Sequence, residues 1–204
     1  VAGLSLTDAD FNVVIGVNAL SADTKGSKSV AVGTDALQTQ NFTTATDAFN
    51  VAVGYNSGNS VTTGVKNTLI GGNSGDALTD ADFNVAVGNG SLSSDTQGSH
   101  SVALGHFALR SKNFTTATDA YNVAVGSQAG TAITTGIRNP ILGGQAGDAL
   151  TDADDNVAVG ALALSADTLG SQAVAIGRGA LKVQNFTTAT NSYNVAVGYS
   201  AGES

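Results

Sequence analysis

Residues 84–88 have the sequence NVAVG, and variants of this pentapeptide occur eleven times in the 204-residue chain. The intervals between their closing glycines are 17, 21, 17 and 17 residues, then the same four again, then 17 and 21. Four units therefore form a super-repeat of 72 residues, a period typical of repeat architectures. We interpret 1–204 as one repetitive domain, made of super-repeats 1–72, 73–144 and the incomplete 145–204. The closing glycines are Gly16, Gly33, Gly54, Gly71, Gly88, Gly105, Gly126, Gly143, Gly160, Gly177 and Gly198.

Further columns of similar residues follow each closing glycine. The third position after it is always Ala or Ser, and the fourth alternates in pairs between Leu and Gly. The eighth position is Thr in every complete 17-residue unit. Such columns indicate that equivalent residues lie one above another in successive units.

The pentapeptide itself predicts a β-strand. Its centre is rich in β-branched residues and is flanked by glycine, and no 3.6-residue periodicity accompanies it. Units of 17 residues are too short for a βαβ pair or a four-stranded propeller blade. We therefore expect an all-β parallel β-solenoid (β-roll) of about eleven 17- or 21-residue coils. With coils about 4.8 Å apart, the rod would be on the order of 50 Å long.

The composition excludes several classes of protein. Hydrophobic residues make up 42% of the chain, which is too apolar for a disordered linker. Without Cys, disulfides and thiolate metal sites are excluded. No apolar run is long enough for membrane insertion, and the net charge of −8 disfavours nucleic acid as a partner. Because the chain begins with Val1 and has no signal-like segment, we expect it to be a processed or excerpted piece of a longer polypeptide.

Alternation within the strand makes both of its faces apolar. The two Val side chains share one face and the Ala takes the other. Either Val residues such as Val13, Val53 and Val87 fill the interior and an Ala stripe lies outside, or the converse holds and a Val stripe lies outside. Either stripe needs a cover, so we predict a lateral homo-oligomer, with a homotrimer favoured. The Ala column consists of Ala31, Ala52, Ala86, Ala103, Ala124, Ala158, Ala175 and Ala196.

Two stretches resemble the repeats of phage tail-fibre shafts: GYNSGNSVTTGVKNTLIG (54–71) and GSQAGTAITTGIRNPILG (126–143). Repeats of that family have the form NTAIGYxALxxxTTGxx. The segments SVAVG (29–33) and SVALG (101–105) are similar to coils in the heads of trimeric autotransporter adhesins, which are parallel β-rolls on bacterial surfaces. The 21-residue units and the TDAD turns of this chain depart from both patterns, and no chaperone domain of the tail-fibre type is present.

The resemblance implies a non-enzymatic structural fibre or shaft protein, part of a phage tail fibre that spaces or presents host-receptor contacts. The alternative is a bacterial extracellular adhesin, or a surface filament whose subunits join end to end. Either implies an extracellular location, on a virion fibre or a bacterial cell surface, with a cell-surface glycan or receptor as partner. No cofactor is expected.

The three 21-residue units insert an eight-residue segment, NFTTATDA or NFTTATNS, that should protrude from the rod every fourth coil. Exposed loops on a rigid scaffold are frequent binding sites. The alternative is that the Phe of each insertion packs on a neighbouring coil or chain and only pins the loop. The candidate contact residues are Phe42, Thr43, Thr44, Phe114, Thr115, Thr116, Phe186, Thr187 and Thr188.

Acidic turns of sequence GDALTDAD occur twice. Alternating carboxylates in a glycine-rich β-roll suggest calcium, which prefers several oxygen ligands at one point. Calcium rolls, however, place the motif on consecutive coils, whereas these copies lie four coils apart, so solvated turns with Asx caps are the alternative. The calcium candidates are Asp76, Asp80, Asp82, Asp148, Asp152 and Asp154.

The Thr column raises a minor alternative, an ice-binding solenoid. Ice-binding faces generally need two parallel ranks of Thr, and only one persists here, so a ladder that satisfies the hydroxyls within the solenoid is favoured.

No pattern supports catalysis. Glu occurs once, at Glu203, and the two imidazoles, His100 and His106, have no equivalents in the sister repeats. The first two positions after each closing glycine vary most, so we expect them to be exposed and to offer further contact surface. Examples are Val17 and Asn18, Tyr55 and Asn56, His106 and Phe107, Arg178 and Gly179, and Tyr199 and Ser200.

Overall fold

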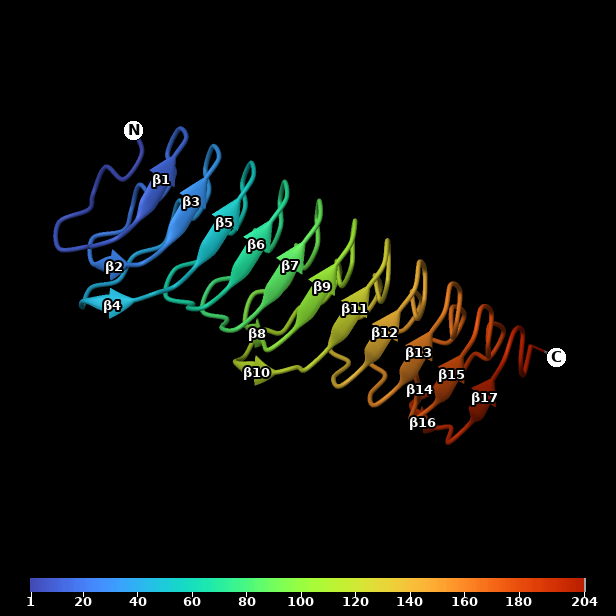
Figure 1. The fold of residues 1–204 in the computed structure, drawn as a ribbon. Helices are drawn as coiled ribbons and strands as arrows, with labels where there is room; N and C mark the ends of the chain where they lie inside the picture. The colour runs from blue at the N-terminus through green and yellow to red at the C-terminus, as the bar shows by residue number, and fades with distance from the viewer. Residues whose placement is uncertain (204) are drawn as a thin grey trace.

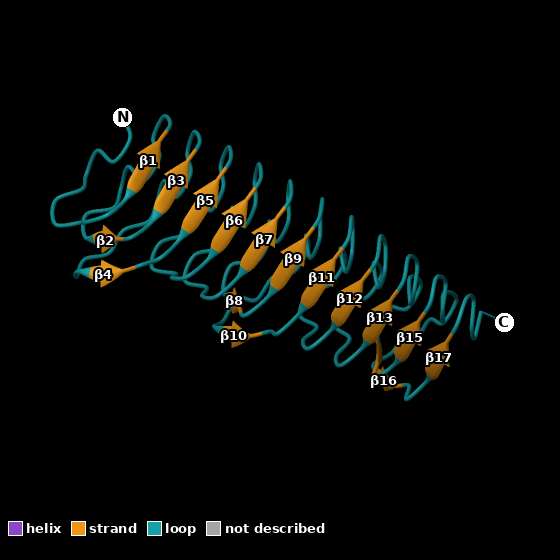
Figure 2. Ribbon diagram, in the orientation of Figure 1, coloured by secondary structure: helices purple, strands orange, loops and turns teal. Residues whose placement is uncertain are grey.

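The chain winds into a rod of stacked coils, as expected for a parallel β-solenoid (Figure 1). The structure is a computed structural model that describes residues 1–203. These residues form seventeen strands and no helix (Figure 2), so no helix able to cross a membrane occurs among them. Eleven strands make one sheet along the rod, and every pairing in it is parallel. They are β1 (Val13–Ile15), β3 (Val30–Val32), β5 (Val51–Val53), β6 (Thr68–Ile70), β7 (Val85–Val87), β9 (Val102–Leu104), β11 (Val123–Val125), β12 (Pro140–Leu142), β13 (Val157–Val159), β15 (Val174–Ile176) and β17 (Val195–Val197).

The remaining strands are two residues long, and each pair joins a 21-residue unit to the 17-residue unit before it. They form three separate parallel pairs that lie along one side of the rod at intervals of four coils (Figure 1). These pairs carry the insertions, so the regular protrusions expected from the sequence are present. The pairs are β2 (Gly26–Ser27) with β4 (Thr46–Asp47), β8 (Gly98–Ser99) with β10 (Thr118–Asp119), and β14 (Gly170–Ser171) with β16 (Thr190–Asn191).

The orientation of the strands decides between the two possible apolar stripes. The central residue of β3, β5, β7, β9, β11, β13 and β15 is a fully buried Ala, and the residues on either side of it point outward. The register keeps the columns straight, since Ala31 pairs with Ala52 and Ala86 with Ala103. Alanine therefore lines the interior and the Val stripe lies outside.

A tight corner follows each strand of the main sheet. The closing glycines have φ between +125° and +138°. At Gly33, a Cβ atom would lie 2.3 Å from the carbonyl oxygen of Gly54 in the next coil. The positive φ and the close approach of two backbones both require glycine, which explains why this column never varies.

Leu and Gly alternate in pairs after the corners because the size of the neighbouring strand centre changes in the opposite sense. In coils with Leu at the fourth position, such as Leu37 and Leu92, the neighbouring strand centre is Ala. Where that position is Gly58 or Gly75, the intervening strand β6 carries the larger Leu69, and a Cβ on either glycine would lie 2.7 Å from a methyl carbon of Leu69. Each coil therefore holds a similar apolar volume, as close packing requires.

A ladder of buried asparagines closes the interior on the other side of each strand. The Oδ1 atom of Asn67 accepts the backbone N–H of Asn84 at 3.0 Å, and its Nδ2 donates to the carbonyl of Ala81 at 2.7 Å. The same pattern recurs at Asn84 and Asn139. The asparagines that open most of the pentapeptides thus join successive coils and satisfy buried backbone groups.

Candidate interaction surfaces and a buried polar site

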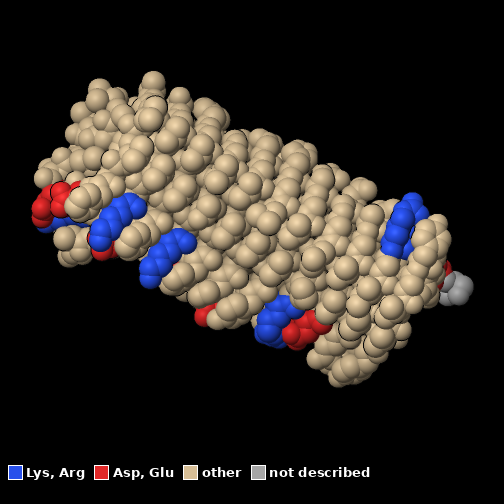
Figure 3. Space-filling model, in the orientation of Figure 1, with Lys and Arg blue, Asp and Glu red and all other residues tan. Residues whose placement is uncertain are grey.

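The largest uniform surface is the aliphatic stripe formed by the outward residues of the main sheet. Figure 3 shows this face as an uncharged band with charged side chains along its margins. Most of its residues are half-buried, and the exposed ones range from 38% at Ile70 to 60% at Ile15 and 72% at Val195. Within the outward positions only Thr68 and Pro140 are not Val, Ile or Leu. An apolar surface this continuous usually marks an interaction site.

The candidate contact residues on the protrusions fall into two groups that differ in exposure. Phe42 and Phe114 are only 6% and 8% exposed, so these rings pack inward and pin the insertion, as the alternative interpretation proposed. Phe186 is half-buried. By contrast, the threonine pairs are exposed and available to a partner: Thr43, Thr44, Thr115, Thr116, Thr187 and Thr188.

The six acidic calcium candidates do not converge. Asp80 accepts a hydrogen bond from the hydroxyl of Thr63 at 2.6 Å, and Asp82 accepts the backbone N–H of Val65 at 2.7 Å. In the next copy, Thr135 donates to Asp152 and the N–H of Ile137 to Asp154. No group of three or more His, Asp or Glu that could hold a metal occurs in residues 1–203. The turns thus use these carboxylates to tie one coil to the preceding one.

Asp76 and Asp148, the other two acidic candidates, differ from the TDAD carboxylates. In each, the Oδ1 atom is buried without a hydrogen-bond partner. Burial raises the pKa of both carboxyl groups above the usual 3.8. The ionised form of each therefore costs folding free energy.

The Thr column is engaged within the solenoid. The hydroxyl of Thr62 donates to the carbonyl of Thr79 at 3.1 Å, and Thr79 donates in turn to Thr96 at 3.0 Å. Thr134 and Thr151 repeat this arrangement. The column has the geometry of the internal ladder that the sequence favoured.

Of the two variable positions after each closing glycine, only the first is exposed as expected. The first position is exposed, as at Tyr55, His106 and Arg178. The second is half-buried at Asn56 and buried at Gly179, because these residues have positive φ and turn back toward the rod. The expectation of exposure was therefore correct for the first position and wrong for the second.

A second surface column escaped the sequence analysis. It consists of the residues five positions before each closing glycine, which all have φ between 50° and 61°. Over eight coils an aromatic residue alternates with a basic residue or His. The Lys66 amine lies 4.8 Å from the centroid of the Phe83 ring, and the Phe83 and His100 rings stack 4.9 Å apart. Neighbouring side chains thus cover ring faces within the column, which makes it a surface ladder of cation–π and stacking contacts.

Polar residues also reach the solenoid interior, at the seventh position after the closing glycine. In the first copy, the Oδ1 atom of the buried Asp23 accepts the backbone N–H groups of Gly26 and Phe42, at 3.0 and 3.1 Å. Its Oδ2 accepts from the Gln40 amide at 2.6 Å. The third copy repeats these contacts with Asp167 and Gln184. Each super-repeat thus contains one buried carboxylate.

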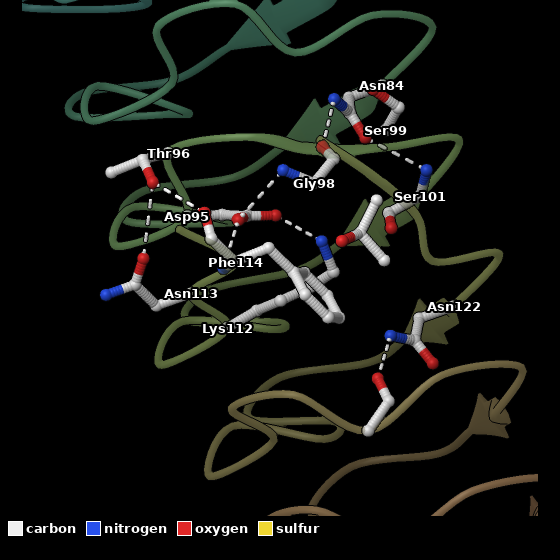
Figure 4. Close-up of polar contacts among 12 residues, drawn as sticks. Asn84, Asp95, Thr96, Gly98, Ser99, Ser101, Lys112, Asn113, Phe114 and Asn122 are labelled. Atoms are coloured by element: carbon white, nitrogen blue, oxygen red, sulfur yellow. Dashed lines mark hydrogen bonds and ion pairs between the residues drawn. The ribbon is translucent and has the colours of Figure 1, made fainter. Parts of the chain in front are cut away.

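The middle copy has a lysine in place of the glutamine (Figure 4). The amine of Lys112 contacts Oδ2 of Asp95, and both side chains are completely buried. Burial lowers the pKa of Lys112, while the attraction of Asp95 acts in the opposite direction. The signal in the sequence was a column that reads Asp, Gln, Val, Leu, Asp, Lys, Ile, Leu, Asp, Gln, with polar and apolar pairs at the same interior position.

No pocket is found in the part of the chain that the structure describes. The chain matches no protein-family model, no curated protein and no solved structure. The absence of enzymatic activity, of a cofactor and of a nucleic-acid partner therefore stay predictions from the sequence.

Proposed function

We propose that the chain is a segment of a structural fibre shaft that spaces or presents receptor contacts, as in a phage tail fibre. The observation that carries this proposal is the main sheet, whose eleven parallel strands run along the rod without interruption. Cross-strand hydrogen bonds, the Asn ladder and the Thr column join every coil to the next. A spacer needs this stiffness, and it needs no catalytic site.

The aliphatic stripe supports lateral self-association, with a homotrimer proposed. A stripe that stays apolar on every coil costs free energy in water, at roughly 25 cal/mol for each Å² left uncovered. A second and third copy of the same chain would present the same straight stripe, in the same repeat. Rods joined in this way would also resist bending better than a single rod.

The exposed threonine pairs are the proposed contact residues for a cell-surface glycan or receptor. They lie on the three protrusions, which recur at the same side of the rod (Figure 1). Hydroxyl groups held on a rigid scaffold can exchange hydrogen bonds with sugars. A bacterial adhesin would use the same surface, so the virion and cell-surface proposals share this part of the mechanism.

The proposal is tested by placing a charge on the stripe. Val87 is an outward residue of β7, near the middle of the rod, and Val87→Asp would bury a carboxylate in the assembly. We expect sedimentation to show that this variant dissociates. Ser94→Asp adds the same charge at an exposed position off the main sheet and should keep the assembly intact. Equal masses for the two variants would contradict an assembly through the stripe.

A further inference from the structure

The buried pair of Lys112 and Asp95 is unusual for its position. A fully buried lysine is rare, because burial of its charge costs desolvation free energy. The equivalent pairs of the other copies are a carboxylate and an amide, Asp23 with Gln40 and Asp167 with Gln184. The fold therefore does not require a cation here, yet the middle copy supplies the one side chain that can act as a nucleophile.

The surroundings of Asp95 activate its carboxyl group. Its Oδ1 atom accepts the backbone N–H groups of Gly98 and Phe114, at 3.1 and 3.0 Å. Two backbone donors on one oxygen would stabilise the negative charge that develops there when the carboxyl carbon is attacked. The Lys112 amine lies against the other oxygen, Oδ2, and the Phe114 ring centroid lies 4.7 Å from the amine (Figure 4). Nucleophile and carboxyl group are thus held together in a site that excludes water.

We propose that Lys112 and Asp95 become joined by an intramolecular amide bond. A proton first crosses from the ammonium to Oδ2, leaving a neutral amine and a carboxylic acid. The Nζ lone pair then forms the bond to Cγ, the Cγ–Oδ2 bond breaks, and one amine proton moves to the departing hydroxyl. The products are a secondary amide and one water molecule, so neither an oxidant nor a co-reactant is needed.

Burial favours two requirements of this reaction, a neutral amine and the loss of water. The lowered pKa of Lys112 raises the fraction of neutral amine. The dry surroundings favour loss of water over hydrolysis. The hydroxyl of Ser101 is also buried, without a hydrogen-bond partner. In the first copy, its counterpart Ser29 lies 3.4 Å from the Gln40 amide nitrogen.

The bond would connect two adjacent coils near the middle of the rod. Asp95 and Lys112 are separated by 17 residues, one full coil. A covalent link here would prevent those coils from separating under tension, which goes beyond the spacing role proposed above and does not depend on it.

The test is the intact mass of the denatured full-length chain. We expect the wild-type mass to be lower than the sequence mass by one water molecule. Trypsin should then yield a branched peptide that contains 67–110 and 111–138, without cleavage after Lys112. Lys112→Gln recreates the pair found in the other two copies, so it should fold and have its full sequence mass.

Two results would overturn the proposal. One is a full sequence mass for the folded wild-type chain. The other is loss of water that persists in Lys112→Gln, because the water would then come from another residue.

Gln40→Lys places the same pair beside Asp23, with Ser29 and Phe42 in the equivalent positions. It should lose a second water molecule, and a folded variant that loses only one would show that this geometry is insufficient.

Discussion

The closing glycines constrain this fold at the scale of single residues, and Gly71 and Gly72 offer a matched comparison. Gly71 has φ +131°, and a Cβ there would lie 2.6 Å from the Gly88 carbonyl oxygen. Gly72 lacks a positive φ, and the nearest atom to its Cβ would be the side-chain nitrogen of Asn89 at 3.2 Å. We expect Gly71→Ala to lower the free energy of unfolding by about 2–4 kcal/mol, from backbone strain and steric overlap. Gly72→Ala should change it by less than about 0.5 kcal/mol.

Chemical denaturation of the two variants measures this difference. Similar losses in both would show that the corner does not depend on the conformation of Gly71.

Asp76 makes stability depend on pH in an unusual direction for a carboxylate. Its pKa in the folded chain is raised above 3.8 by burial. The stability it contributes is therefore present below about 3.8 and is lost as the pH rises through the raised pKa. Asp76→Asn removes this dependence, so the stability of the variant relative to wild type should increase with pH across that window. Melting temperatures measured from acidic to neutral pH check the trend, and a constant difference between the two chains would contradict it.

At the scale of the coil, the exchange of volume between strand and corner predicts an energetic coupling. Leu69→Ala alone leaves a cavity and should cost about 2–5 kcal/mol. Gly75→Leu alone overlaps Leu69. Leu is nevertheless accommodated at the equivalent corner position elsewhere, since Leu92 has φ 53° there. The double variant recreates the Ala and Leu arrangement of the other coils.

A double-mutant cycle measures this coupling. The double variant should be more stable than the sum of the single effects by about 1–3 kcal/mol. Additive effects would mean that the alternation of Leu and Gly has no packing basis.

The elements of the fold followed from the sequence because each coil repeats the same local signals. The strands of the main sheet, their parallel stacking and the positions of the protrusions all rest on columns visible in the repeat. The inward packing of Phe42 was one of two alternatives that the sequence left open. The direction of the strand faces could not be predicted, because Ala and Val are both apolar and either can line an interior. The width of the folded coil decides the choice, and it selects Ala, the smaller residue, for the inward face.

The buried carboxylates escaped prediction for a different physical reason. Asp, Gln and Lys at one position normally indicate a solvated surface. Their burial depends on backbone donors from the next coil, such as the N–H of Phe114 on Asp95. Such partners become visible only when the coils are stacked. The aromatic and basic column was missed because its members share a positive φ and not a residue type.

At the scale of the whole molecule, the aliphatic stripe connects the fold with the proposed function. It extends from β1 to β17, and its outward residues are half-buried or exposed on every strand. A solitary rod would expose this apolar face along its whole length, whereas a bundle of three would bury it in a common seam. We therefore propose that the chain is a laterally assembled shaft.

The most direct test is the molar mass of the 204-residue chain in solution, measured by light scattering over a range of concentrations. Assembly through the stripe predicts a mass near three times the 20.1 kDa of one chain, retained on dilution. A folded chain with the mass of a single copy at every concentration would contradict it.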